Sequence, residues 1–236
     1  MILVFGKTGQ VAQELQRLGD VVALDRNDVD LSNPQACADA VKHHSLNAVI
    51  NAAGYTAVDM AEEEETLATV INGDAPTAMA KACAELDIPL VHISTDYVFA
   101  GTGEIPWGPD NRTAPQNAYG RSKLTGEIGV RDSGAVYANL RTSWVVSAHG
   151  ENFVKTMLRL SESEGALNVV ADQIGGPTPA RDIAAACLQI AEQIAQDQSK
   201  SGTYHFSGTP NVSWADFATQ IFDLAGKPMK VTAVPT

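Results

Sequence analysis

The chain has 236 residues, of which 44% are hydrophobic and 19% are charged, and this composition is typical of a folded globular protein rather than a disordered one. Its formal net charge of −12 disfavours a nucleic-acid partner and an anionic membrane surface, because both need clustered Lys and Arg. Cys37, Cys83 and Cys187 are far apart in sequence, and no basic leader or membrane-length apolar segment follows Met1, so we expect a cytoplasmic protein with reduced thiols.

The first half of the chain alternates short apolar runs with alanine-rich amphipathic stretches. We expect strands at 2–6, 21–25, 47–54, 89–95 and 135–146, and helices at 10–18, 34–43, 75–86 and around Tyr119 and Lys123. This alternation predicts an α/β fold with a doubly wound parallel sheet, which we assign to residues 1–147. The acidic run 62–65 is expected to be a solvated helix start.

The rhythm changes after about Ser147. We expect helices at 152–161, 180–196 and 213–225, strands at 167–170 and 203–208, and a loop at 171–179. Residues 148–236 should form mainly a small substrate-binding lobe, with some elements returning to the main sheet.

A glycine-containing turn follows the first strand directly and opens the first helix, in the run Gly6, Lys7, Thr8, Gly9, Gln10, Val11, Ala12. Gly6 permits the tight turn, Gly9 allows close approach of a pyrophosphate, and a small residue at Ala12 lets the helix pack on the sheet. The helix N-terminus then offers free N–H groups to phosphates. The turn is therefore a candidate dinucleotide site, and Gly6, Thr8, Gly9, Gln10 and Val11 are candidate cofactor residues.

The second and third strands end in residues that suit the same ligand. Asp25 can accept the adenosine ribose hydroxyls, while the adjacent Arg26 could pair with an extra phosphate, so NADH and NADPH both stay open. Asp30 and Leu31 are plausible adenine contacts. The third strand ends in small residues and is followed by two further candidates for the cofactor edge, in the run Ala52, Ala53, Gly54, Tyr55, Thr56.

Tyr119 and Lys123 lie four residues apart, so on a helix they share one face. A nearby cation favours phenolate and could lower the tyrosine pKa enough for proton transfer near pH 7. Ser94 and Thr95 end the preceding strand and could add hydroxyl groups to this pair.

With these motifs the chain resembles the extended short-chain dehydrogenase/reductase superfamily, whose members share a Rossmann fold. The segments that carry the resemblance are FGKTGQVA at 5–12, NAAGYTAVD at 51–59, STDYVFAG at 94–101, YGRSK at 119–123, LRTSWV at 140–145, NFVKTMLRL at 152–160 and DQIGGPT at 172–178. They cover the chain nearly end to end. The similar proteins continue with a proline-rich segment and a helix, so we expect the lobe to be truncated at the C-terminus.

The resemblance implies reduction, by NADPH or NADH, of the C4 keto group of a dTDP-linked 6-deoxy-hexulose. It assigns Tyr119 as proton donor, Lys123 as the group that holds the nicotinamide ribose and lowers the tyrosine pKa, and Thr95 as a hydrogen-bond donor to the carbonyl oxygen. Asp96 and Trp144 are expected substrate contacts, although a tryptophan in a strand is a core residue about as often.

The resemblance also raises three other functions and a metal site. Sugar-nucleotide dehydratases resemble the chain but carry Asp then Glu after the threonine, whereas Tyr97 follows Asp96 here, so elimination is disfavoured. A non-catalytic dinucleotide-binding subunit, like the regulatory subunit of methionine adenosyltransferase, and another sugar-nucleotide reductase or epimerase stay open. Some relatives hold Mg²⁺ at a dimer contact; Glu14 matches one position but Arg181 and Asp182 occupy the region of another. We therefore disfavour a Mg²⁺-bridged dimer, although Mg²⁺ stays open, and we assign no metal ligands. Glu14 is expected on the surface, and a homodimer stays open.

Overall fold

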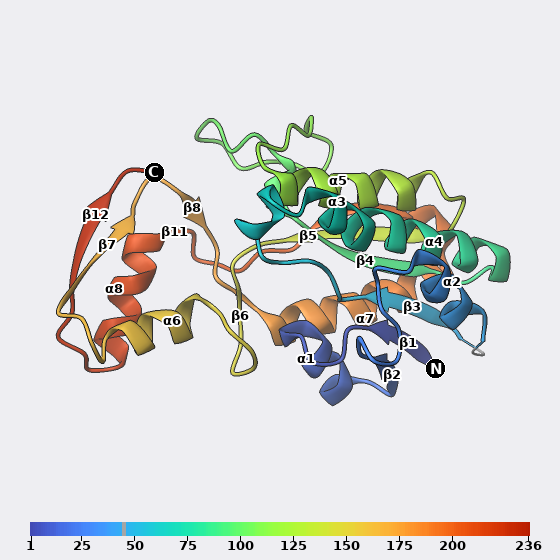
Figure 1. The fold of residues 1–236 in the computed structure, drawn as a ribbon, viewed down its shortest axis with the longest axis horizontal. Helices are drawn as coiled ribbons and strands as arrows, with labels where there is room; N and C mark the ends of the chain where they lie inside the picture. The colour runs from blue at the N-terminus through green and yellow to red at the C-terminus, as the bar shows by residue number, and fades with distance from the viewer. Residues whose placement is uncertain (44–45) are drawn as a thin grey trace. The chain divides into compact units, whose positions relative to one another are not determined.

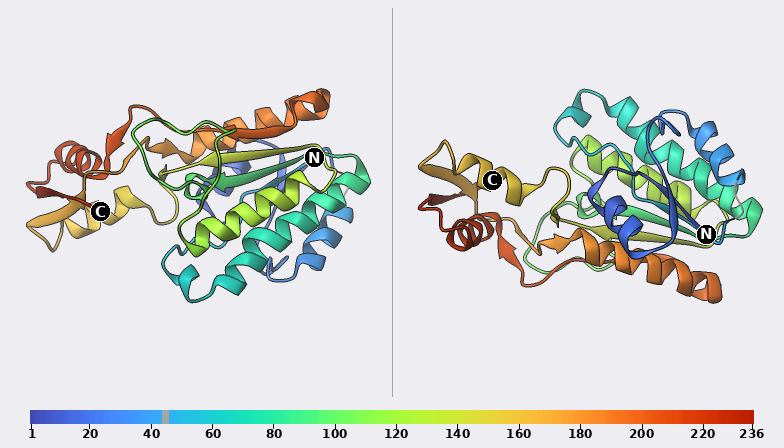
Figure 2. Two further views of the ribbon diagram at one scale, coloured as in Figure 1. Left: turned by 90° about the horizontal axis from the view of Figure 1, so that it is seen from above. Right: turned by 90° about the horizontal axis from the view of Figure 1, so that it is seen from below.

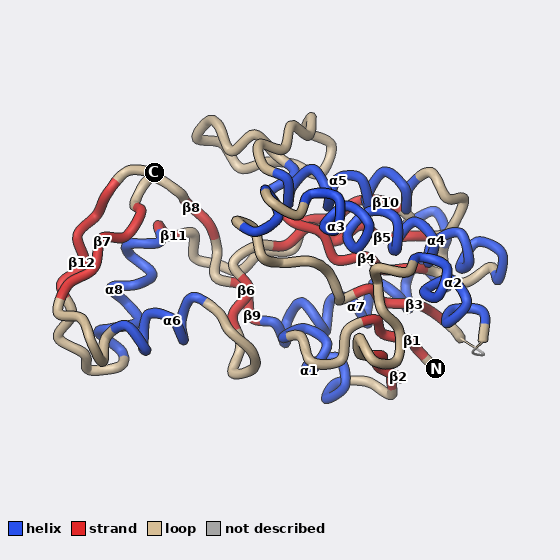
Figure 3. Tube along the Cα trace, in the orientation of Figure 1, coloured by secondary structure: helices blue, strands red, loops and turns tan. Residues whose placement is uncertain are grey.

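The computed structural model describes residues 1–43 and 46–236 and divides them into two compact units. Unit 1 contains Met1–Thr142 and Arg181–Phe206, and unit 2 contains Ser143–Ala180 and Ser207–Thr236. Figure 1 labels most of the helices and strands of both units, and Figure 3 labels the remaining ones.

Unit 1 is built on one six-stranded sheet whose neighbouring strands are all parallel. In spatial order the strands are β10 (Gly202–His205), β5 (Tyr137–Thr142), β4 (Leu90–Thr95), β3 (Ala48–Asn51), β1 (Ile2–Phe5) and β2 (Val21–Leu24). The chain moves to one side of β1 for β2 and to the other side for β3. Ligands bind at such a switch point, outside the carboxyl ends of the strands. The expected doubly wound parallel sheet is confirmed.

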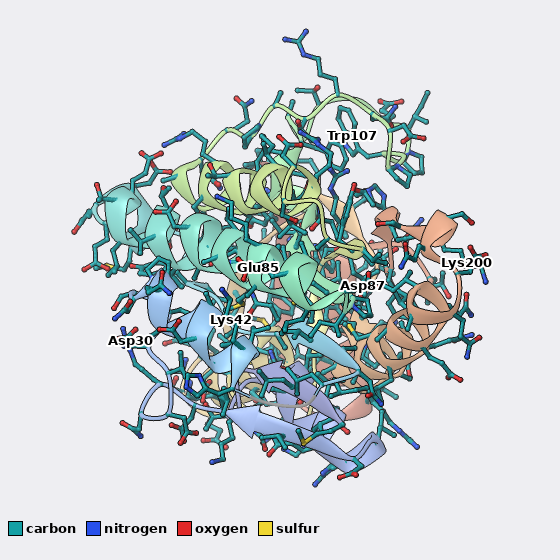
Figure 4. The ribbon with its side chains drawn as sticks, turned by 90° about the vertical axis from the view of Figure 1, so that its right-hand side faces the viewer. Asp30, Lys42, Glu85, Asp87, Trp107 and Lys200 are labelled. Atoms are coloured by element: carbon teal, nitrogen blue, oxygen red, sulfur yellow. The ribbon has the colours of Figure 1, made fainter. Side chains whose placement is uncertain are left out.

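Helices cover both faces of this sheet (Figures 1 and 2). One face carries α2 (Pro34–Lys42), α3 (Glu65–Thr69), α4 (Ala75–Leu86) and α5 (Ala118–Arg131), and the other carries α1 (Gln10–Leu18) and α7 (Ala180–Gln196). An ion pair of 2.5 Å joins Lys42 of α2 to Glu85 of α4 on the surface, as Figure 4 shows.

The central strands are apolar because both of their sides are covered. Leu3, Val4 and Phe5 of β1 and Val49 and Ile50 of β3 are all fully buried. A parallel sheet with helices on both faces requires such continuous apolar runs rather than alternation.

The acidic run 62–65 contributes more than a solvated helix start. Glu62 accepts a hydrogen bond of 2.7 Å from the N–H of Ala118, the first residue of α5. Glu65 accepts two hydrogen bonds, of 2.7 and 2.9 Å, from the guanidinium of Arg121. This run therefore holds the start of α5, the helix that bears Tyr119 and Lys123.

The helix expected at 75–86 is α4 (Ala75–Leu86), and the helical segments that lead into it were not predicted. A 3₁₀ turn at Met60–Glu62 and α3 precede a π-helical turn at Val70–Asp74, which leads directly into α4. Residues 99–117, between β4 and α5, form a long segment without helix or strand (Figure 3).

Unit 2 contains short strands and two helices around its own apolar core. Its elements are β6 (Val145–Val146), α6 (Phe153–Leu160), β7 (Ala166–Val170), β8 (Ile174–Gly175), β9 (Thr178–Pro179), β11 (Val212–Ser213), α8 (Trp214–Leu224) and β12 (Lys230–Val234). The segment 171–179, expected to be a loop, contains two of these strands. The expected strand 203–208 is β10, which lies in the sheet of unit 1. Met157, Ala218, Ile221 and Phe222 are among the buried residues of the core.

Within the described ranges, none of the helices has both the length and the apolar character that crossing a bilayer requires.

Candidate active site

The turn after β1 accepts only glycine at its first position. Gly6 has φ +96°, and a Cβ there would lie 3.2 Å from the backbone carbon and oxygen of Ala52 at the end of β3. The N–H of Gly6 donates to the carbonyl of Leu24 at 2.9 Å, so the turn is tied to both neighbouring strands. Gly9 is the N-cap of α1 and brings no side chain to the helix end. The turn can therefore lie close to a phosphate group.

A cleft of about 500 Å³ opens at this switch point. It brings together most of the residues that the sequence proposed for the cofactor: Gly6, Thr8, Gly9, Asp25, Arg26, Asp30, Leu31, Ala52, Ala53, Gly54, Tyr55 and Thr56. Gln10 and Val11 do not line it, and Val11 is buried in the core. The cleft also has lining residues that sequence reasoning missed: Lys7, Leu24, Val29, Glu64, Leu67 and Ile71.

Asp25 presents a fixed carboxylate at the end of β2. Its Oδ1 accepts hydrogen bonds from the N–H groups of Asn27 at 2.8 Å and Asp28 at 3.2 Å, and chiefly the first of these lowers the pKa of Asp25. The ammonium of Lys7 lies 3.7 Å from Asp25 Oδ2 and 3.8 Å from Asp28 Oδ2. Arg26 is mostly exposed and lies 3.6 Å from Asp30. The fixed carboxylate of Asp25 and the exposed cations Lys7 and Arg26, each paired with a carboxylate, thus lie where an adenosine ribose is expected.

Tyr119 and Lys123 both lie on α5, as the sequence predicted. Asn117 caps this helix by accepting a hydrogen bond of 2.8 Å from the N–H of Gly120. Lys123 is buried, and its ammonium donates to the carbonyl of Ile93 in β4 at 2.6 Å. A Cβ on Gly54 would lie 4.0 Å from Lys123 Nζ, so this ammonium lies beside the edge of the cleft.

The pKa of Tyr119 is shifted opposite to the sequence expectation. Burial raises the pKa of Tyr119 to about 12, and a hydrogen bond with Thr95 opposes the rise without cancelling it. Burial also lowers the pKa of Lys123 to about 8, against the carboxylate of Glu127, which favours the charged lysine. The expectation of a lowered tyrosine pKa is therefore wrong, because desolvation outweighs the effects that favour the phenolate.

Thr95 lies at the end of β4, next to the phenol. Its hydroxyl donates to Asp96 Oδ1 at 3.2 Å and accepts from the N–H of Tyr97 at 3.2 Å. Tyr97 packs edge-on against Tyr119 with ring centroids 5.5 Å apart. Desolvation raises the pKa of Asp96 above its usual value, although the residue as a whole is exposed. Thr95, Asp96, Tyr119 and Lys123 therefore form one group within unit 1.

Asn72, in the π-helical turn, is a site residue that sequence reasoning missed. Its Oδ1 accepts from the N–H of Tyr55 at 2.8 Å, and its Nδ2 donates to the carbonyl of Tyr55 and to Ser122 Oγ, both at 3.0 Å. This buried amide ties the cleft edge to α5. The available signal was an asparagine directly after two apolar residues, Val70 and Ile71, since a buried amide needs partners.

Trp144 lies in unit 2, where it is part of an aromatic cluster. Its ring stacks on Trp214 with centroids 3.4 Å apart and an interplanar angle of 12°, and Phe217 and Phe153 complete the cluster. The backbone of Trp144 has φ +50°, a conformation that favours glycine.

The positions weighed for Mg²⁺ give no ligand set. Glu14, expected on the surface, is buried in α1 and lies 3.8 Å from Arg17. Arg181 and Asp182 lie in the first turn of α7. Among residues 1–43 and 46–236, no group of three or more His, Cys, Asp or Glu side chains could hold a metal ion.

Comparison with known sequences finds one family over the whole chain. The model of the RmlD substrate binding domain matches residues 1–236. The dTDP-4-dehydrorhamnose reductase of Salmonella typhimurium is 42% identical over 250 residues, which cover 100% of this chain and 83% of that enzyme. The reductase of the same name from Sinorhizobium fredii is 40% identical and covers 98% and 81% of the two chains.

Solved structures agree with the sequence comparison. A dTDP-4-dehydrorhamnose reductase from Clostridium acetobutylicum superimposes with a TM-score of 0.92 at 38% identity, over 100% of this chain and 84% of that one. The reductase from Bacillus anthracis, solved in complex with NADP, gives a TM-score of 0.91 at 36% identity, with the same coverage of 100% and 84%. A UDP-glucose 4-epimerase from Brucella ovis, at 18% identity and a TM-score of 0.83 over 99% and 85% of the two chains, shares the fold.

Proposed function

This chain belongs to the RmlD substrate binding domain family, that of the dTDP-4-dehydrorhamnose reductases, and we propose on that basis that it reduces dTDP-6-deoxy-L-lyxo-4-hexulose at C4 to dTDP-L-rhamnose. NADPH or NADH supplies the hydride. The observation that carries the proposal is the grouping of Thr95, Tyr119 and Lys123 at the carboxyl end of β4, beside the cleft edge at Gly54.

The residues of the cleft fit a dinucleotide. The Gly6 turn, which a Cβ would obstruct, and the N-terminus of α1 would hold the pyrophosphate. Asp25 would accept the adenosine ribose hydroxyls, and Lys7 or Arg26 would pair with the additional phosphate of NADPH. Both cofactors are therefore compatible with this end of the cleft.

Tyr119 is the proposed proton donor. A phenol whose pKa is raised to about 12 stays protonated at neutral pH, which is the form that a reduction needs. As hydride reaches C4, negative charge grows on the carbonyl oxygen, and proton transfer from Tyr119 neutralises it. The Thr95 hydroxyl would donate to the same oxygen, and two donors placed in advance stabilise the transition state more than the ground state.

Lys123 would hold the nicotinamide ribose. Its ammonium is already fixed by the carbonyl of Ile93 and lies beside Gly54, so little side-chain freedom is lost on binding. A cation here also favours the phenolate that Tyr119 becomes after it gives up its proton.

The substrate side of the proposal rests on fewer contacts. Asp96 adjoins Thr95 and could accept a hydrogen bond from a sugar hydroxyl. We assign the binding of the dTDP-sugar to unit 2 as well, with Trp144 as an aromatic contact, because its indole already belongs to a stacked cluster. The buried free thiols of Cys37, Cys83 and Cys187 support a cytoplasmic location, and a homodimer stays a prediction.

The test is oxidation of NADPH or NADH by the keto-sugar nucleotide, followed by absorbance. Tyr119→Phe removes the donated proton and should lower kcat by about 10²–10⁴-fold, with cofactor affinity nearly unchanged. Tyr204→Phe is the matched control, since the Tyr204 hydroxyl contacts only the Lys200 carbonyl among the hydrogen bonds described and should leave turnover intact.

Two results would contradict the proposal. Unchanged turnover in Tyr119→Phe would remove the tyrosine from the mechanism. A wild-type protein that binds cofactor but turns over no keto-sugar would favour a non-catalytic dinucleotide-binding subunit.

A further inference from the structure

A buried ion pair lies directly behind the proposed catalytic group. Glu127, on α5, accepts two hydrogen bonds from Arg141 of β5, from Nε at 2.9 Å and from Nη2 at 2.7 Å. Both side chains are more than nine-tenths buried, at 4% and 7% exposure. Ser94 Oγ adds a third hydrogen bond to the same carboxylate, at 2.5 Å. Within the described part of the chain, the hydrogen bonds to this carboxylate come from β4 and β5.

The position of Glu127 on α5 connects it to the reaction. Tyr119, Lys123 and Glu127 follow each other at intervals of four residues and so lie along one face of the helix. Each of the three contacts the end of β4: the phenol meets Thr95, the ammonium meets the Ile93 carbonyl, and the carboxylate meets the Ser94 hydroxyl. Three successive turns of α5 are therefore held on three successive residues of β4.

The partner of Glu127 is fixed on its far side as well. Arg141 Nη1 donates to the Pro109 carbonyl at 3.1 Å, and its guanidinium lies over the Phe99 ring at 4.9 Å. Arg141 Nη1 also lies 3.4 Å from His205 Nε2, while His205 Nδ1 lies 3.1 Å from the Trp107 carbonyl. Because a guanidinium only donates and a carbonyl only accepts, His205 is neutral with its proton on Nδ1. The Arg141 guanidinium is thus held by Glu127, the Pro109 carbonyl, the Phe99 ring and His205.

We propose that Glu127 is a positioning residue of the reductase: held by Arg141 and Ser94, its carboxylate balances the buried Lys123 ammonium and keeps α5 in register with Thr95. Stability alone does not explain a buried ion pair, because apolar residues of similar volume often stabilise the folded state as well or better. A buried carboxylate one turn from a buried ammonium has a use that apolar residues lack.

The charges around Lys123 agree with this role. Glu127 is the charged group that favours the protonated lysine, against the effect of burial. His92 and Glu127 are the titratable groups that interact with Lys123. Arg141 and Tyr137 act on or respond to Glu127, and His205 contacts Arg141. Asp96 and Tyr97 act on Tyr119, one turn before Lys123. His92 has its pKa lowered well below the usual value by burial and by Lys123, so it stays neutral.

The test uses two variants and one control. Glu127→Gln keeps the shape of the side chain but removes its charge, so Arg141 loses its carboxylate partner. Glu127→Met with Arg141→Met removes both charges and should restore stability. Glu85→Gln removes a surface carboxylate that is also ion-paired, with Lys42, and controls for the substitution itself. Melting temperature and the dissociation constant of NADPH are measured from about pH 6 to about pH 9.5, and kcat/KM is measured over the same range.

We expect NADPH affinity in the wild type and in Glu85→Gln to fall as pH rises past the Lys123 pKa of about 8. We call this fall the alkaline limb. In Glu127→Gln it should lie about one pH unit lower than in the wild type. In the double variant the shift should be smaller, because the positive charge of Arg141, which repels the lysine, is also gone. If Glu127→Gln fails to fold, the proposal is tested by comparing the alkaline limb of the double variant with that of the wild type. An alkaline limb that is absent from the wild type, or unmoved in a stable double variant, would overturn the proposal.

This inference rests on the proposed function through the assignment of Lys123 to the cofactor. The NADPH-binding measurement contains no keto-sugar nucleotide, so a wrong substrate assignment would abolish turnover without changing the pH dependence of NADPH binding. The two failures are therefore distinguishable.

Discussion

At the scale of single residues, burial shifts the pKa values of Tyr119 and Lys123 in opposite directions, and both shifts favour the neutral form. For the tyrosine this is useful, since a proton donor must hold its proton until the substrate oxygen gains charge. For the lysine it is a cost, because an ammonium that binds a ribose must stay charged in a buried position. Function and stability thus conflict at Lys123.

Replacing Lys123 by Met should therefore stabilise the protein while abolishing most turnover. The folded-state pKa of about 8 lies below the ordinary value of 10.5, so burying the ammonium destabilises the native state below about pH 8 and this penalty fades as pH rises toward 10.5. We expect Lys123→Met to gain about 2 kcal/mol at pH 7 and clearly less at about pH 10. Urea unfolding of both proteins at the two pH values measures it. A variant that is less stable than the wild type at pH 7 would contradict the expectation.

Lys7 should discriminate between the two dinucleotides. Its ammonium lies between Asp25 and Asp28 in the cleft and can leave them for a ribose phosphate. Lys7→Gln should weaken NADPH binding by about 5–10-fold and leave NADH binding nearly unchanged, whereas Asp25→Asn should weaken NADH more than NADPH. Fluorescence titration with each cofactor measures the ratio.

Lys200→Gln removes a lysine paired only with Asp197, at 3.9 Å, among the ion pairs described, and serves as the control. Equal effects of Lys7→Gln on both cofactors would show that Lys7 acts on a part that the two molecules share.

Sequence reasoning succeeded for residues whose role depends on the local chain and failed for those that depend on distant partners. The Gly6 turn and the spacing of Tyr119 and Lys123 are local, and the structure has both. Asn72 reaches Tyr55 across 17 residues. The direction of the Tyr119 pKa depends on burial by other elements, which no local pattern contains.

At the scale of elements, α5 carries three interior glycines that lie against other segments, two of them against backbone oxygens and one against a threonine side chain. A Cβ would lie 2.3 Å from the Tyr97 carbonyl oxygen at Gly120, 2.1 Å from that of Asn72 at Gly126, and 1.8 Å from Thr77 Oγ1 at Gly129. Each glycine costs the helix about 1 kcal/mol relative to alanine. The close approach that they allow brings α5 against the π-helical turn that holds Asn72.

Gly126→Ala should therefore destabilise the protein despite its better helix propensity. Two atoms at 2.1 Å cannot coexist, so α5 must shift away from Asn72, at a cost of about 1–3 kcal/mol. Because Tyr119 and Lys123 move with the helix, kcat should fall as well. Gly202→Ala, where nothing lies within 4 Å, is the matched control and should change neither quantity. Thermal unfolding and the turnover assay together test the prediction, which a neutral or stabilising Gly126→Ala would refute.

The long elements of unit 1 could be predicted from the sequence because each has a clear periodicity and a turn or cap at its ends. α1 begins and ends where the pattern indicated, and α2 begins at Pro34 with Asn33 as its cap. The short strands β8, β9 and β11 could not be predicted, since two residues carry no periodicity and pair only through contacts far along the chain.

At the scale of the whole molecule, the protein is acidic and its ligands are anionic, so local cations must concentrate them at the cleft. Binding then stabilises the native state by mass action. NADPH at about 100 times its dissociation constant should add about 2.7 kcal/mol and raise the melting temperature by several degrees.

Gly6→Ala obstructs the turn beside Ala52 and should show a much smaller shift than the wild type at the same concentration. Differential scanning fluorimetry with each protein measures both shifts. Equal shifts in the two proteins would place the cofactor elsewhere.

Each unit is built from two separate segments of the chain, and this affects when each unit can fold during synthesis on the ribosome. The chain leaves unit 1 after Thr142, returns at Arg181 and leaves again after Phe206, while β10 pairs with β5 and β12 pairs with β7. Gly202 meets Ala138, and Lys230 meets Ala166, each across 64 residues. Neither pairing can form until its later strand has left the exit tunnel, so unit 1 is completed only after β10 has emerged and the β7–β12 pair of unit 2 only after β12 has emerged. For the same reason, exchanging unit 2 between relatives requires two segments to be replaced together.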